Sequence, residues 1–147
     1  MITRATEYAC LAMLYLAKQP AGSSCNTADI AAVERIPGSF LAKVINQLAK
    51  GGLVISRRGP QGGLELARDP ATITLRQVVE VIEGEVAVNV CTSSQAYTCF
   101  RSGCSLKSAF HDAQAAYLGR LEAVTLASLV RDDRYTPDGP APAAAVI

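Results

Sequence analysis

Apolar residues recur every three or four positions through much of the chain, a period that predicts helices. Residues 4–18 contain no Gly or Pro, and Tyr8, Leu11 and Tyr15 share one face of the helix that they predict. Further leucines make this helix apolar nearly all round, so we expect it to be buried.

Two short helices are predicted next, with a tight turn between them. Asn26 or Thr27 can cap the first, which runs to about Arg35. The Pro-Gly-Ser sequence at 37–39 then breaks the chain, and its serine can cap a second helix over 39–50.

The second short helix is amphipathic. Its apolar positions follow the i, i+3, i+4, i+7 spacing that places them on one face, namely Leu41, Val44, Ile45 and Leu48. The opposite face is polar and carries Ser39, Lys43, Asn46, Gln47 and Lys50. A pair of glycines at 51–52 ends the helix.

A β-hairpin and a further helix are predicted after these glycines. Two short apolar runs, 53–56 and 64–67, flank a glycine-rich loop with the sequence RRGPQGG. A capping box opens a helix over 74–83, which repeats apolar residues at helical spacing and ends at Gly84.

The C-terminal part of the chain predicts one long helix over 105–131, after an irregular segment over 86–104. Such a helix would extend about 40 Å, which favours a projecting helix that pairs with a second copy of the chain. The alternative is that it folds back on its own domain. Its apolar seam comprises Phe110, Ala113, Tyr117, Leu121 and Val124.

The order of these elements is typical of a winged helix-turn-helix protein, in which the second short helix enters the DNA and the hairpin forms a wing. We therefore predict a mainly α fold with a small β-hairpin wing. The predicted parts are a winged helix-turn-helix DNA-binding domain over 1–84, a cysteine-bearing sensor loop over 85–104, a dimerisation helix over 105–134 and a flexible tail over 135–147.

Charge is distributed in a way that agrees with DNA binding. The 147-residue chain has a net charge of only +1, but residues 1–68 hold eight basic and four acidic side chains. All of this excess lies between Arg35 and Arg68, where six basic residues stand against Glu65 alone. A local basic segment of this kind suits a polyanionic partner even when the whole chain is neutral.

The predicted DNA interface combines helix 39–50 with the hairpin loop. Lysines suit phosphates, and Asn and Gln can pair with base edges in the major groove. An arginine on a slender Gly/Pro loop fits the narrow minor groove. The alternative is an ordinary solvated helix face. The residues concerned are Ser39, Phe40, Lys43, Asn46, Gln47, Lys50, Arg57, Arg58, Gly59, Pro60 and Gln61.

Composition excludes several other classes of protein. Half of the residues are hydrophobic, which rules out general disorder, and five cysteines do not suit a small secreted disulfide protein. A single histidine and no phosphate-binding glycine loop argue against an enzyme. No apolar run is long enough to span a bilayer, so we expect a cytoplasmic protein without a membrane partner.

Residues 36–68, with FLAKVINQLAKGGLV followed by RRGPQGGLELARDP, resemble the DNA-binding half of the IscR/NsrR-type bacterial transcription regulators (the Rrf family). The Arg-Gly-Pro-x-Gly-Gly sequence at 58–63 is the most specific part, and TRATEYACLAML near the N-terminus also fits. The resemblance covers about residues 1–133. It implies a homodimeric regulator, a repressor, that binds a palindromic operator in double-stranded DNA.

Three cysteines, Cys91, Cys99 and Cys104, are spaced C-x7-C-x4-C in the irregular segment. Thiolates in flexible loops are the usual ligands of iron–sulphur clusters, whereas zinc ribbons use closer cysteine pairs. The spacing by itself is weak evidence. The resemblance implies that these cysteines hold a [2Fe–2S] or [4Fe–4S] cluster, although the common family spacing is C-x5-C-x5-C.

The fourth ligand is less well defined. Some family members place a histidine three residues after the third cysteine, where this chain has Lys107, and His111 is expected to be too far along the helix. Other members take a carboxylate from the first helix of the partner subunit, a position that Glu7 matches. Alternatively, Glu7 only complements the helix dipole. Cys10 is expected to be a core residue and Cys25 an exposed one, neither of them a ligand.

The implied regulator senses iron, redox state or nitric oxide through the cluster, whose state shifts the loop and the recognition helices. Two alternatives stay open from the residues themselves. The same fold could be regulated by oxidation of the cysteine thiols without a cluster, or the cysteines could hold a structural zinc.

Overall fold

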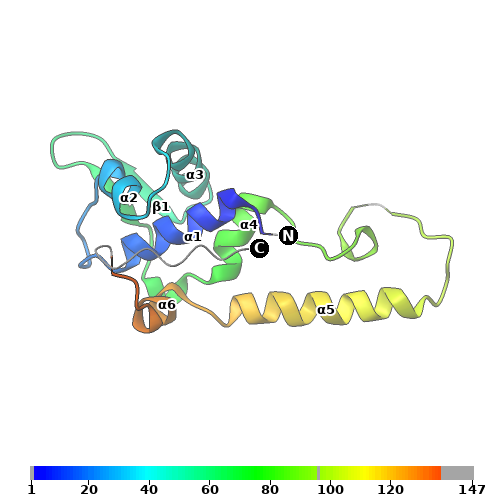
Figure 1. Ribbon diagram of the computed structural model, residues 1–147. Helices are drawn as coiled ribbons and strands as arrows, with labels where there is room; N and C mark the ends of the chain where they lie inside the picture. Colours follow the sequence, from blue (N-terminus) through cyan, green and yellow to red (C-terminus); the bar gives the residue numbers. More distant parts are fainter. Residues whose placement is uncertain (1, 96, 137–147) are drawn as a thin grey trace.

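The computed structural model describes residues 2–95 and 97–136, which form six α-helices and one two-stranded sheet (Figure 1). Two short 3₁₀ turns, η1 and η2, complete the described elements. In chain order these are α1 (Arg4–Ala17), α2 (Thr27–Val33), α3 (Gly38–Lys50), β1 (Val54–Arg57), β2 (Gly63–Leu66), η1 (Pro70–Thr72), α4 (Leu75–Glu83), η2 (Val90–Thr92), α5 (Ser105–Glu122) and α6 (Leu126–Asp132).

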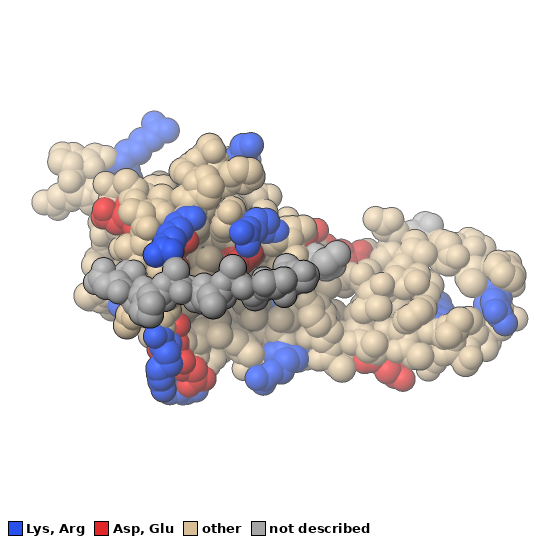
Figure 2. Space-filling model, in the orientation of Figure 1, with Lys and Arg blue, Asp and Glu red and all other residues tan. Residues whose placement is uncertain are grey.

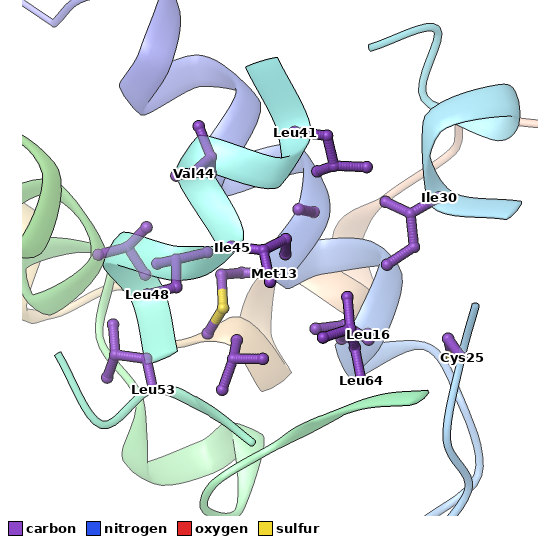
Figure 3. Close-up of a cluster of buried hydrophobic side chains, with 14 of the residues drawn as sticks. Met13, Leu16, Cys25, Ile30, Leu41, Val44, Ile45, Leu48, Leu53 and Leu64 are labelled. Carbon is purple, nitrogen blue, oxygen red and sulfur yellow. The ribbon is translucent and has the colours of Figure 1, made fainter. Parts of the chain in front are cut away.

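Helix α1 lies at the centre of the hydrophobic core, with α3, α4 and α6 packed around it. Its fully buried face is Ala9, Ala12, Met13 and Leu16, while Tyr8, Leu11 and Tyr15 are only partly buried. The helix is therefore buried as predicted, but its deepest face differs from the predicted one, and Ala9 and Ala12 on it let neighbouring elements approach closely. Figure 3 shows Met13 beside the inward side chains of α3, and Leu16 beside Leu64 of β2.

The wing is an antiparallel hairpin in which Val54 pairs with Leu66 and Arg57 pairs with Gly63. Each strand lies one residue from its predicted position. Cys25 and Leu64 exchange two backbone hydrogen bonds of 2.8 Å, so the turn before α2 adds a short bridge to the hairpin. The expectation that Cys25 is exposed is therefore wrong, since only 8% of its surface is accessible.

Helix ends follow the predicted signals at most positions. Asn26 caps α2, Thr74 and Gln77 form the predicted capping box of α4, and Gly84 ends α4 with a φ of 75°. The predicted cap of α3 is wrong: the helix begins at Gly38 and no side chain bonds its first turn. Ser39 instead lies inside that turn with an exposed side chain.

The prediction of a single long helix over 105–131 is also wrong. Helix α5 ends at Glu122, and Thr125 caps a separate helix, α6, through a capping box with Ser128. The break is held by backbone bonds to the segment before α4: Leu75 N–H donates to Val124 at 2.7 Å, and Leu126 N–H donates to Ile73 at 2.9 Å. These two bonds and the burial of Leu126 compensate for the helical backbone hydrogen bonds that are lost at the break.

The molecule thus consists of a body and an arm (Figure 1). Helix α6 folds back on α1, whereas α5 projects from the body, and the segment between α4 and α5 runs beside it. Among the described residues, no helix is long and apolar enough to cross a membrane. Most of the predicted flexible tail, residues 137–147, lies outside the described residues, but Tyr135 donates a hydrogen bond of 3.1 Å to the carbonyl of Val33.

Candidate DNA interface and sensor segment

Helix α3 presents all of its predicted polar residues to solvent. Leu41, Val44, Ile45 and Leu48 are buried against the core and fix the rotation of the helix about its axis. Because the apolar side is buried, the opposite, polar side of the helix faces solvent. Its exposed members are Ser39, Phe40, Lys43, Asn46, Gln47 and Lys50.

An aromatic contact joins α1 to this face. The rings of Tyr8 and Phe40 meet edge to face with centroids 6.2 Å apart. A cation lies over each ring, with Lys43 Nζ 5.8 Å from Phe40 and the guanidinium of Arg4 5.5 Å from Tyr8. Because Phe40 is 53% exposed, this contact brings Lys43 and Arg4 to one surface at the N-terminal end of α3.

The wing carries two adjacent arginines with different surroundings. Arg57 forms an ion pair of 2.7 Å with Glu65 on the facing strand. Arg58 is exposed and, within the described residues, forms no ion pair. Both arginines are predicted to contact DNA, and Arg58 is the more available of the two because it is not held in an ion pair among the described residues.

Glycines give the wing loop its shape. Gly59 has a φ of +112°, which side chains other than glycine rarely adopt, and a Cβ at Gly62 would collide with the carbonyl oxygen of Arg57. Pro60 and Gln61 lie exposed between them. The loop is consequently narrow, and Arg58 lies exposed at its start. Figure 2 shows Lys and Arg side chains along the edge of the molecule where the wing and α3 lie.

The three candidate cysteine ligands lie on different elements. Cys91 is in η2, Cys104 is the residue before α5, and Cys99 lies in the irregular segment between them. Backbone N–H groups of Lys107 and Leu106 point at the Cys104 thiol and, together with the charges of Arg101 and Lys107, lower its pKa. Burial raises the pKa of the Cys10 thiol to about 11, as suits a core residue.

These ligands do not converge in this conformation. Across residues 2–95 and 97–136, no three Cys, His, Asp or Glu side chains lie close enough together to hold a metal ion. Glu7 is exposed in the first turn of α1 and pairs with Arg4 at 2.7 Å, which also agrees with its alternative role at the helix terminus. His111 lines an open depression of about 460 Å³ with Cys104 and Lys107.

Comparison with known proteins decides the family. The sequence profile of the Rrf2 family, described as an iron-dependent transcriptional regulator, matches residues 2–132. The chain belongs to the Rrf2 family. It is a DNA-binding winged helix-turn-helix regulator of transcription, not an enzyme, as the sequence predicted.

Relatives of this Rrf2-family regulator match it over most of their length. The transcriptional regulator NsrR of Shouchella clausii is 35% identical over 133 residues, which cover 90% of this chain and 89% of the relative. NsrR of Geobacillus kaustophilus is 35% identical over 132 residues, covering 89% and 90%.

Solved structures confirm the fold of this Rrf2-family regulator. IscR of T. potens superposes with a TM-score of 0.73 at 27% identity, over 90% of this chain and 87% of that one. CymR, the global cysteine regulator of B. subtilis, superposes with a TM-score of 0.78 at 23% identity, over 90% and 98%. The predicted mainly helical architecture with a two-stranded wing is therefore confirmed.

Two features of this Rrf2-family regulator were not predicted. Tyr8 contacts Phe40 across α1 and α3, and Gln114 of α5 bonds the segment that carries Cys91. Both contacts join residues distant in sequence, and neither has a local spacing signal. A tyrosine on a helix and a glutamine on an exposed helix are too common to be singled out from one sequence.

Proposed function

We propose that this chain is a homodimeric repressor that reads a palindromic operator with α3 and the wing, and that its DNA affinity is set by the state of Cys91, Cys99 and Cys104. The observation that carries the DNA part is the outward polar face of α3 together with an exposed Arg58 on a narrow loop. These two surfaces suit a major groove and the adjacent minor groove.

Roles on the DNA follow from the chemistry of the side chains. Lys43, Lys50 and the uncapped first turn of α3 near Ser39 suit phosphate oxygens, because cations and free N–H groups favour anions. Asn46 and Gln47 can form paired hydrogen bonds with base edges. Phe40 supports Lys43 rather than reading a base, since the lysine lies over its ring.

The same reasoning separates the wing residues. Arg58 is the minor-groove side chain, because a narrow groove concentrates negative potential that attracts a guanidinium. Arg57 is held in an ion pair by Glu65, so it stiffens the base of the wing and contributes less than Arg58 to the contact with DNA. Gly59, Pro60 and Gln61 provide the slender backbone that enters the groove.

The exposed apolar side of α5 supports the dimer part of the proposal. Phe110 of α5 is partly exposed, and Ala113 and Tyr117 on the same side are exposed. Leu121, in contrast, is buried by its own chain, and Val124 lies in the break between α5 and α6. The dimer seam that we propose is therefore shorter than the sequence predicted. Two-fold symmetry of the dimer would match the two-fold symmetry of a palindrome.

The donor set fits an iron–sulphur cluster in chemistry. The three thiols are free cysteines, and the lowered pKa of Cys104 favours the thiolate that binds iron. Cys91, Cys99 and Cys104 would hold the cluster, with Glu7 of the partner subunit as a replaceable fourth ligand. When bound, an iron–sulphur cluster supplies redox and ligand-exchange chemistry for sensing. The family description as iron-dependent supports this assignment.

Thiol oxidation without a cluster is the second candidate. The observation that favours it is the partly exposed position of Cys104 together with its lowered pKa, which are the features of an oxidisable thiol. Its resolving partner would be Cys91 or Cys99.

One experiment on DNA tests the interface. The double variant Lys43→Ala/Arg58→Ala should bind an operator, selected from a random duplex pool, on the order of 100-fold more weakly than the wild type. Its plot of log affinity against log salt should be shallower by about one to two. Arg120→Ala/Arg131→Ala removes the same charge from α5 and α6 and should bind as the wild type does. Equal weakening in both variants would show that only net charge matters.

An anaerobic purification tests the cofactor. We expect bound iron and a visible absorption band that persist in Cys10→Ala and disappear in Cys99→Ala. A colourless, iron-free wild-type protein after anaerobic reconstitution would rule out the cluster and leave thiol oxidation or a structural zinc, which a zinc assay of the same sample distinguishes.

A further inference from the structure

Gln114 of α5 forms two side-chain hydrogen bonds that tie η2 and its neighbours to the arm. Its carboxamide oxygen accepts from the N–H of Val88 at 3.0 Å, and its nitrogen donates to the carbonyl of Thr92 at 3.1 Å. Both partners are backbone groups, so one side chain fixes the path of the main chain on either side of Cys91.

Residues 85–94 are also braced internally. Glu85 accepts from the N–H of Ser94 at 2.5 Å and from its hydroxyl at 2.6 Å, which closes the segment into a loop. Asn89 caps η2 by accepting from the N–H of Cys91 at 3.3 Å, and the side chain of Thr92 is 6% exposed. The segment is therefore a small ordered unit that moves with Cys91, and Gln114 attaches it to α5.

The attachment point is far from the third cysteine. Gln114 follows Cys104 by ten residues of helix, which at 1.5 Å per residue is about 15 Å along α5. Figure 1 shows the η2 segment beside α5 and the chain continuing to the tip of the arm before it turns into that helix. A disulfide needs Cα atoms within about 7 Å, and thiolates that share an iron–sulphur cluster must converge on it. Because the residue after Cys91 is bonded to Gln114, these bonds hold the segment of Cys91 beside the middle of α5, away from Cys104 at the start of that helix.

We propose that Gln114 is a latch that holds Cys91 away from Cys104, and that the cysteines assemble only when the two bonds to Val88 and Thr92 break. The inference rests on the proposed function only in that Cys91 and Cys104 act together. Whatever joins the thiols selects the released state, so the latch lowers the affinity for that ligand. Release also frees a side chain in the middle of the arm, which links the state of the cysteines to α5.

Cross-linking tests the latch without iron. Reduced full-length protein carrying Cys99→Ser is treated anaerobically with dibromobimane, a reagent that bridges two neighbouring thiols, and the Cys91–Cys104 product is followed by peptide mass spectrometry. Gln114→Ala should form this product about five to thirty times faster than the parent, because two hydrogen bonds no longer oppose release. Asp112→Ala, on an exposed part of the same helix, should match the parent.

A second measurement keeps the test decisive. Amide hydrogen exchange over 85–94 should accelerate in Gln114→Ala and, less strongly, in Gln114→Glu, which retains only an acceptor for Val88. Unchanged cross-linking together with unchanged exchange in both variants would overturn the latch. Faster cross-linking in a protein that never binds iron would uphold the latch and reject the cluster, so the two proposals fail separately.

Discussion

Glu83 joins the end of α4 to the start of α1. One of its carboxylate oxygens accepts from Thr3 N–H at 2.9 Å and from the Thr3 hydroxyl at 2.7 Å, and the buried Thr6 hydroxyl donates to the same atom. The bonds from Thr6 and Thr3 lower the pKa of Glu83. The negative charge also lies at the N-terminus of α1, where the helix dipole favours it.

Replacement of Glu83 with Gln should destabilise the protein by about 1 kcal/mol at neutral pH, because the hydrogen bonds lose their charge. Because the pKa of Glu83 is lower in the folded than in the unfolded protein, its ionised carboxylate stabilises the fold at pH values above the unfolded-state pKa. This stabilisation is lost as the pH falls through the folded-state pKa. The difference in unfolding free energy between the wild type and Glu83→Gln should therefore be constant near pH 7 and shrink below about pH 4. Urea unfolding at several pH values measures it, and a difference that grows on acidification would contradict the assignment.

At the scale of elements, the break between α5 and α6 depends on tertiary contacts. Leu126 is fully buried beneath α1, and the Thr74–Thr125 bridge ties the break to α4. The sequence over 105–131 has no proline and one glycine, so local preference alone favours a continuous helix. The helix breaks instead, because α6 can then pack on the body and place Leu126 and Leu129 against the core.

Leu126→Ala should therefore cost about 2–5 kcal/mol of unfolding free energy, the range for a large-to-small change in a core. Ile55→Ala is a matched control, since Ile55 is an aliphatic residue 40% exposed on β1. It should change stability by less than about 1 kcal/mol. Equal losses in the two variants, measured by chemical denaturation, would mean that α6 does not pack on the core as described.

The contrast between α3 and the cysteine segment shows what one sequence can predict. The exposed face of α3 was predictable because the helical spacing of its apolar residues is visible within a few positions of the sequence. These apolar residues turn inward and so determine which side faces outward. The uncapped start of α3 was not, because Ser39 satisfies the capping preference while the chain begins the helix one residue earlier. The separation of Cys91 from Cys104 was also not predictable, since it depends on Gln114, a residue whose partners lie over twenty positions away.

At the scale of the whole molecule, the proposed dimer rests on the arm. An isolated helix of 18 residues is only marginally stable in water, and α5 exposes large apolar groups, among them Leu106 at 58%. An apolar depression of about 670 Å³ lies at the base of the arm and is lined by Ile2, Val79, Glu83, Glu85, Val86, Ala87, Val88 and Tyr117. An arm and a depression on one chain are what a second copy needs for a self-complementary contact.

The variant Phe110→Asp should consequently shift the protein to monomers, because a carboxylate on the partly buried α5 seam would be desolvated without a partner. Ala115→Asp adds the same charge on the opposite, exposed side of α5 and should remain dimeric. Sedimentation velocity distinguishes the two. Loss of the dimer removes the gain from binding two half-sites at once, so affinity for a palindrome should fall on the order of 100-fold in Phe110→Asp while affinity for a single half-site is unchanged. A dimer that persists in Phe110→Asp would place the interface elsewhere than on α5.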